Sequence, residues 1–155
     1  MGSNETTTQE GGMSAVLVSP EAARENGPKR SVAGVVVKVL LHRRNERGMT
    51  LEPHAARCVS AGEVHELVTT DHTATASGTR IDRVGFVGFA EITRGGVIDR
   101  GDEVWLGDRH LGTVLGFDAC HIPNHYNVLI HTDAPVSGAD LELQPEVAVR
   151  FVPRA

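Results

Sequence analysis

The feature that most constrains the fold of this chain is the recurrence of short apolar runs between glycine-containing turns. The chain has 17 glycines among its 155 residues, and the run at Ser31–Arg43 alternates side chains in the two-residue period of a β-strand. Helix formers are sparse in the middle of the sequence. Roughly seven to nine short strands at this spacing predict an all-β domain, which we expect to be a small closed or partly open β-barrel.

Seven further strands, two of them joined as a hairpin, are expected along the chain. The pair Gly107-Asp108 separates two apolar runs and is typical of a hairpin turn. Gly85 and Gly88 lie inside an apolar run, where glycine marks a bulge or the close approach of a ligand or another backbone. A last strand is expected at Glu146–Val152, and the others are Arg57–Ser60, Glu63–Thr70, Gly85–Thr93, Glu103–Leu106, Arg109–Gly116 and Asn127–His131.

The length indicates one domain, which we place at residues 15–155. Residues 1–14 are polar and glycine-flanked, and we expect them to be disordered. A short N-terminal helix is predicted after Ser19, which suits a helix N-cap, and Pro20 suits the first helical position. Gly27-Pro28 would end that helix.

Charge and composition exclude several classes of function. The net charge of −5 and the pI of about 5.9 do not suit a nucleic-acid-binding protein. No apolar run approaches the roughly 20 residues of a membrane span, and no secretory signal is present, so we expect a cytoplasmic protein without a membrane partner. Cys58 and Cys120 are then expected to be free thiols. The sequence also lacks a phosphate-binding loop, a dinucleotide fingerprint and a Gly-x-Ser-x-Gly elbow.

A compact polar segment between the apolar runs of Leu111–Thr132 is the strongest functional candidate. Such a loop on a rigid β scaffold is typical of a binding or catalytic site. One alternative is a metal site at Cys120, His121 and His125, although Pro123 argues against the helix that would place both rings on one face. We expect neither a metal nor a cofactor. The polar members of the loop are Asp118, Cys120, His121, Asn124, His125, Tyr126 and Asn127.

A second polar segment spans Asp71–Arg83. Asp71 could orient His72 as a general acid or base near neutral pH, or the two could be a solvated pair. Arg80 and Arg83 could clamp a substrate carboxylate, or form a surface salt-bridge patch. Glu91, in an apolar strand, either faces solvent or points inward as a proton donor with a raised pKa.

Two family resemblances bear on function. The run GGVIDRGDEVWLGDRHLGTVLGFD at Gly95–Asp118, with the following NVLIHTD strand, resembles the sorbitol-specific IIA component of bacterial phosphotransferase systems. Those proteins are small β-barrels that carry phosphate on a histidine shortly before this hairpin. His72 is the nearest match, but its surroundings, TTDHTATAS, do not reproduce the family's pattern.

The stretches DHTATASGTRIDRVGFVGFAEI and GFDACHIPNHYN look like a family of small actinobacterial proteins, some of them encoded among natural-product biosynthesis genes. That resemblance implies a relationship to streptonigrin- and kitasetaline-type Pictet–Spenglerases, which condense an indole amine with an aldehyde. Such a reaction needs only a pocket, a proton donor and a base.

These observations lead us to expect a cofactor-independent acid–base enzyme acting on a small molecule, in the form of a homodimer. The alternative is a phosphotransferase-like or ligand-binding barrel without turnover. The expected catalytic residues are Asp71, His72, Glu91, His121 and His125, and the expected substrate-binding residues are Arg80, Arg83, Phe86, Phe89, Asp118, Asn124 and Tyr126.

Overall fold

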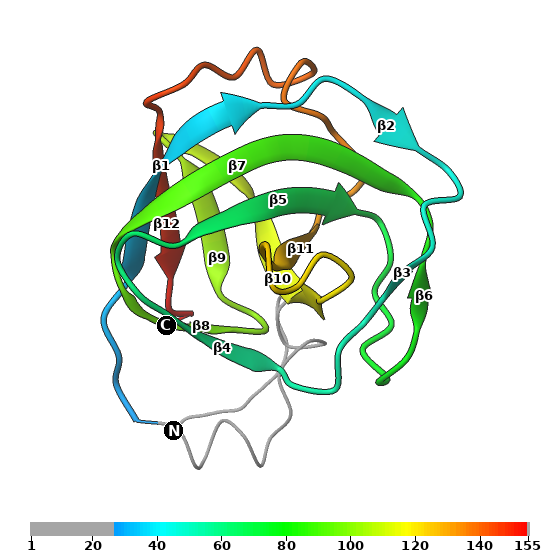
Figure 1. The fold of residues 1–155 in the computed structure, drawn as a ribbon, viewed down its shortest axis with the longest axis horizontal. Coiled ribbons are helices and arrows are strands. Elements are labelled where there is room, and N and C mark those ends of the chain that lie inside the picture. The colour runs from blue at the N-terminus through cyan, green and yellow to red at the C-terminus, as the bar shows by residue number, and fades with distance from the viewer. Residues whose placement is uncertain (1–26, 155) are drawn as a thin grey trace.

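The computed structural model describes residues 27–154, which form an all-β domain without a helix (Figure 1). The helix expected after Ser19 and the disorder expected for residues 1–14 fall outside the described residues. The strands are β1 (Val32–Val39), β2 (Arg43–Arg44), β3 (Met49–Thr50), β4 (Ala56–Val59), β5 (Val64–Thr70), β6 (Arg80–Ile81), β7 (Val84–Arg94), β8 (Gly96–Asp99), β9 (Glu103–Leu106), β10 (Arg109–Asp118), β11 (Asn127–His131) and β12 (Ala148–Val152).

Seven of these strands close into a barrel. Their order around the ring is β1, β12, β9, β10, β11, β5 and β7, and β7 pairs with β1 to complete it. The pair β5–β11 is parallel, whereas the other pairs in the ring are antiparallel. Closure gives each of the seven strands two neighbours for its backbone hydrogen bonds. The all-β barrel predicted from the sequence is therefore confirmed.

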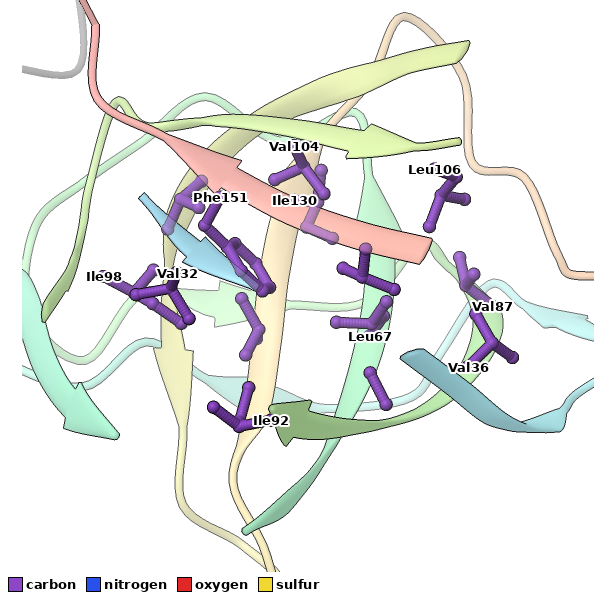
Figure 2. Close-up of a cluster of buried hydrophobic side chains, with 14 of the residues drawn as sticks. Val32, Val36, Leu67, Val87, Ile92, Ile98, Val104, Leu106, Ile130 and Phe151 are labelled. Carbon is purple, nitrogen blue, oxygen red and sulfur yellow. The ribbon is translucent and has the colours of Figure 1, made fainter. Parts of the chain in front are cut away.

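The interior of the barrel is filled by one side-chain face from every strand of the ring (Figure 2). On β5, for example, Leu67 belongs to this interior cluster while its neighbour Val68 belongs to a second one. The same alternation separates Val114 from Leu115 on β10, as the two-residue period of a strand requires.

The second cluster lies on the outer face of the ring, where the segments that contain the short strands β3 and β6 cover it. Met49 and Leu51 come from the β3 segment and Ile81 from the β6 segment, and all three are at most 1% exposed. They pack against outward side chains of four ring strands, namely Val68, Val84, Phe86, Leu115 and Leu129. The barrel therefore has two apolar layers on this side, which explains why β5 and β11 are apolar on both faces.

Most of the expected strands are present, with two differences. The run expected at Ser31–Arg43 is divided, since β1 ends at Val39 and β2 occupies Arg43–Arg44. The polar segment Asp71–Arg83, for which no strand was expected, contains the two-residue strand β6. Gly85 and Gly88 of β7 allow another backbone segment to pack closely against the strand. A Cβ on Gly85 would lie 2.2 Å from the Val136 carbonyl oxygen, and one on Gly88 would lie 2.2 Å from the Lys38 carbonyl oxygen.

Candidate functional site: a buried carboxylate and two histidines

The centre of the candidate site is Glu66, a residue in the middle of β5. Because Leu67 points into the barrel, Glu66 points to the outer face. Its side chain is covered there by the segment between β10 and β11, and the residue is only 5% exposed. Its neighbours across the sheet are Phe89 on β7 and Asn127 on β11.

The covering segment is held in place by Asp118 at the end of β10. One carboxylate oxygen of Asp118 accepts hydrogen bonds from the Cys120 backbone N–H and the Asn127 side-chain amide, and the other accepts one from the Thr50 backbone N–H. Burial alone would raise the pKa of Asp118, but these donors outweigh it and hold the pKa below its usual value. Asp118 was expected to bind substrate, but at 2% exposure it fixes the loop instead.

His125 is the loop residue that meets Glu66. Its Nε2 atom lies 3.1 Å from Glu66 Oε1, and its Nδ1 atom lies 2.8 Å from the side-chain oxygen of Asn124. The edge of the Phe89 ring packs against the His125 ring with a centroid separation of 5.0 Å. His125 is 8% exposed, so the contact between the imidazole and the carboxylate is largely shielded from water.

Both ring nitrogens of His125 thus face acceptor oxygens. A neutral imidazole has one N–H donor and one lone pair, so it satisfies only one of two acceptors. Rotating the exposed Asn124 amide would supply a donor to Nδ1, but Glu66 would then be a buried negative charge facing a neutral ring. A buried carboxylate without a counter-charge is costly. A proton shared between His125 and Glu66, or a metal ion bound by both, would satisfy these atoms and offset the charge of the carboxylate.

His121 completes the group. Its ring stacks on His125 with centroids 4.9 Å apart, and one ligand atom from each of Glu66, His121 and His125 lies within 4.8 Å of the other two. These three residues are the ones that could hold a divalent cation. An Arg47 guanidinium nitrogen lies 3.1 Å from His121 Nε2 and 3.6 Å from the Cys120 sulfur.

Cys120 does not join this group. Its sulfur contacts Asn127 and Arg47. Desolvation and the neighbouring Asp118 carboxylate raise the pKa of the Cys120 thiol, which keeps it in its neutral form at pH 7. Glu66 therefore takes the place that Cys120 has in the trio considered from the sequence. Cys58 and Cys120 are both free, as expected.

A second carboxylate–histidine pair, Glu63 just before β5 and His65 on β5, provides an internal comparison. His65 Nδ1 accepts a hydrogen bond from the Tyr126 backbone N–H, so its Nε2 atom carries the proton and donates to Glu63 Oε1 at 2.8 Å. This hydrogen bond lowers the pKa of Glu63. In a neutral His65 ring, the acceptor nitrogen thus has a donor and the donor nitrogen has an acceptor, whereas both nitrogens of His125 face acceptors. The Tyr126 ring is covered by the Arg57 guanidinium, 3.6 Å from the ring centroid.

Asp71 and His72 lie at the other end of β5. They follow Thr70, which is four residues beyond Glu66, or about 13 Å along a strand. Asp71 pairs with Arg83 at 2.9 Å, and that contact lowers the pKa of Asp71; among the described residues no hydrogen bond joins Asp71 to His72. His72 accepts a hydrogen bond through its backbone oxygen from His131 Nδ1. Its own Nε2 atom is buried without a partner among the described residues, so a phosphoryl donor would not reach that atom.

The other expected site residues are also dispersed. Arg80 pairs with Asp82 at 2.8 Å, which is the salt-bridge alternative of the sequence interpretation. Phe86 is a buried member of the outer apolar cluster and stacks on His42. Glu91 alternates with the interior residues Ala90 and Ile92, so its half-buried side chain points outward rather than into the core.

The two polar segments therefore do not share one cavity. The Asp118–Asn127 loop lies over the first half of β5, whereas Asp71 and His72 follow its far end. The chain around Arg47 links them indirectly, because the Arg47 backbone N–H donates to Asp82 while its side chain reaches His121. A cavity of about 170 Å³ lies away from both segments, beside the β9–β10 hairpin. Leu106, Leu141 and Val147 are among the residues that line it.

Fold and site together define a closed seven-stranded β-barrel with a buried carboxylate–histidine pair on its outer face. A family model matches residues 26–152, and the chain belongs to that family, the Family of unknown function (DUF6917). No curated protein and no solved structure matches the chain. Within residues 27–154, the structure has no helix of the length and apolarity that crossing a membrane requires.

Glu66 is the functional candidate that sequence reasoning missed. It lies within the expected strand Glu63–Thr70 but was not singled out there. The available signal was its setting, because the run VHELV places a carboxylate between residues of a strand that is apolar on both faces. A charged residue in such a strand is buried and needs a partner. Nothing local identifies that partner as His125, which is 59 residues away in sequence.

Proposed function

We propose that this protein is a small-molecule enzyme that works by proton transfer, with Glu66 and His125 as its acid–base pair. One observation carries the proposal: His125 bridges a buried carboxylate and the Asn124 side-chain oxygen, at 3.1 Å and 2.8 Å. An imidazole oriented in this way and backed by a carboxylate donates and accepts protons efficiently. Because water is largely excluded from the pair, its electrostatic effect on a bound reactant is strengthened.

The specific reaction we propose is a Pictet–Spengler condensation of an indole amine with an aldehyde. In that reaction the amine adds to the aldehyde, and the hydroxyl group leaves as water after taking a proton, which gives an iminium ion. The indole then forms a carbon–carbon bond to the iminium carbon and loses a proton. His125 would donate the first proton and accept the second, with Glu66 stabilising its charged form.

The side chains around the pair suit this assignment. The Phe89 ring contacts His125 and offers an apolar surface to a flat substrate. His121 lies exposed against the other side of the His125 ring, at the mouth of the site. The catalytic roles expected for Asp71, His72 and Glu91 remain predictions, and the proposed acid–base pair does not include these residues. We further propose that the protein acts in the cytoplasm in natural-product biosynthesis and forms a homodimer.

The test is turnover of L-tryptophan and acetaldehyde at pH 7 in a metal-chelating buffer, with the tetrahydro-β-carboline product quantified by mass spectrometry. We expect the wild type to exceed the buffer rate, and Glu66→Gln and His125→Gln to lower the enzymatic rate by about 10²-fold or more. Glu63→Gln is the matched control, since it alters the other carboxylate–histidine pair, three residues away along the chain, and its rate should stay within about twofold of wild type.

Two results would overturn parts of this proposal. A wild-type rate equal to the buffer rate would overturn the condensation, and a Glu66→Gln rate equal to the wild-type rate would overturn the assignment of the pair. Binding of L-tryptophan without turnover would favour the alternative of a ligand-binding barrel. Acid-labile phosphate appearing on a histidine after incubation with a phosphocarrier protein would favour the phosphotransferase alternative.

A further inference from the structure

We infer that Glu66, His121 and His125 form a binding site for one divalent transition-metal ion of the Zn²⁺ or Fe²⁺ class. This inference goes beyond the proposed reaction and does not depend on it, although the two share residues. Two imidazoles and one carboxylate are a common ligand set for these ions, whereas Mg²⁺ and Ca²⁺ prefer oxygen ligands throughout.

The contact between Glu66 and His125 already has the spacing of two ligands on one ion. With metal–ligand distances of about 2.1 Å, adjacent ligands lie roughly 3.0 Å apart in octahedral and 3.4 Å apart in tetrahedral geometry. Glu66 Oε1 and His125 Nε2 are 3.1 Å apart. The third ligand atom, from His121, lies within 4.8 Å of both. The exposed His121 ring needs to shift by only one to two ångströms, roughly, to complete the set.

The charges and hydrogen bonds around His125 support the same conclusion. With Nδ1–H donating to Asn124, the lone pair of Nε2 faces the Glu66 carboxylate. A metal ion between these atoms would bind both and neutralise the buried charge. Fixing one ring nitrogen by a hydrogen bond so that the other can ligate is the usual arrangement around metal-bound histidines.

The residue that pairs with Glu66 on β11 also has an unsatisfied buried polar atom. Asn127, the neighbour of Glu66 on β11, is fully buried, and its side-chain oxygen accepts no hydrogen bond from the described residues. Its amide nitrogen donates to Asp118, so rotating the side chain would place its oxygen against a carboxylate. A water bound to the ion would give this oxygen the donor that it lacks.

The Arg47 guanidinium opposes metal binding at this site. The Arg47 guanidinium donates to His121 Nε2 at 3.1 Å, so it competes for this histidine both by its hydrogen bond and by its positive charge. Removing that charge should therefore strengthen metal binding. This expectation separates a site at His121 from adventitious binding by other surface histidines, such as His110, which pairs with Glu103 on the β9–β10 hairpin.

The test is calorimetric titration of the chelator-treated full chain with Zn²⁺, together with the visible absorption spectrum after addition of Co²⁺. We expect one ion per chain, about a hundredfold weaker binding in Glu66→Gln, and at least tenfold weaker binding in His121→Gln. Arg47→Gln should bind more tightly than wild type. Glu63→Gln and His110→Gln, which change histidine pairs outside the site, should bind as the wild type does.

Because His121 is exposed, His121→Gln tests the site even if Glu66→Gln fails to fold. Wild-type protein that binds no stoichiometric Zn²⁺, or His121→Gln that binds it with unchanged affinity and an unchanged Co²⁺ spectrum, would overturn the inference. The outcome is distinguishable from that of the proposed function, since turnover in chelating buffer is measured without metal and metal binding is measured without substrate.

Discussion

Individual residues decide the chemistry of this barrel through the contacts that the fold gives them. His65 and His125 are both 8% exposed, and both have a carboxylate partner, Glu63 just before β5 and Glu66 on β5. His65 has a backbone donor on one nitrogen and an acceptor on the other, which suits a neutral ring. His125 has acceptors on both sides, which suits a cation. The difference in function that we propose for them rests on this contrast.

Asp118 is predicted to be the strongest single determinant of the loop that carries His125. Replacing it by asparagine turns one acceptor oxygen into a donor that faces N–H groups, so Asp118→Asn should lower the free energy of unfolding at pH 7 by about 2–3 kcal/mol. The measurement is urea unfolding, with the exposed Asp133→Asn as the control, which should change stability by less than about 0.5 kcal/mol.

The pH dependence of this effect follows from the depressed pKa of Asp118. The carboxylate stabilises the folded state fully at pH values above its unfolded pKa of about 3.9, and that contribution is lost as the pH falls through the lower folded value. The difference in unfolding free energy between wild type and Asp118→Asn should therefore shrink as the pH is lowered below about 4. A difference that stays constant down to pH 2 would contradict this account.

At the scale of elements, the strands were largely predictable and their partners were not. The last strand was expected at Glu146–Val152, and its alternate residues Val149 and Phe151 are buried in the core. Alternation of this kind is a local property that a sequence displays. The parallel pairing of β5 with β11 is not local, and it is this pairing that places Glu66 beside the loop ending at Asn127.

Gly85 is a position where the sequence predicted close packing within a strand but did not identify the packing partner. Glycine within β7 was expected to mark close approach of a ligand or a backbone, and the structure places the Val136 backbone there. Gly85→Ala should lower the free energy of unfolding by about 1–3 kcal/mol, because a Cβ would lie 2.2 Å from the Val136 oxygen. Chemical denaturation tests this, with Gly27→Ala as the control, since a Cβ there meets nothing within 4 Å. Equal stability of the two variants would be inconsistent with the packing described.

At the scale of the whole molecule, ring closure and the outer apolar layer together create the site. The ring gives β5 two strand neighbours. On its outer face the layer around Leu51 packs against Val68, and the segment between β10 and β11 covers Glu66, so this carboxylate is buried. The sequence indicated His121 and His125, and the structure brings both of them beside Glu66. The sequence could not exclude His72 from this site. Whether Asp71 and His72 lie near the Asp118–Asn127 loop depends on the direction in which β5 runs past that loop. The sequence also could not show that Arg83 pairs with Asp71.

Both proposals depend on Glu66 and His125 acting as one coupled pair, and a double-mutant cycle measures that coupling directly. Unfolding free energies would be determined in chelating buffer at pH 7 for wild type, Glu66→Gln, His125→Gln and the double variant, with the Glu63–His65 cycle as a matched control. The account predicts a favourable coupling of about 1–3 kcal/mol for Glu66–His125 and a smaller one for the more exposed control pair. A coupling of zero for Glu66–His125, with the single effects simply adding, would contradict it.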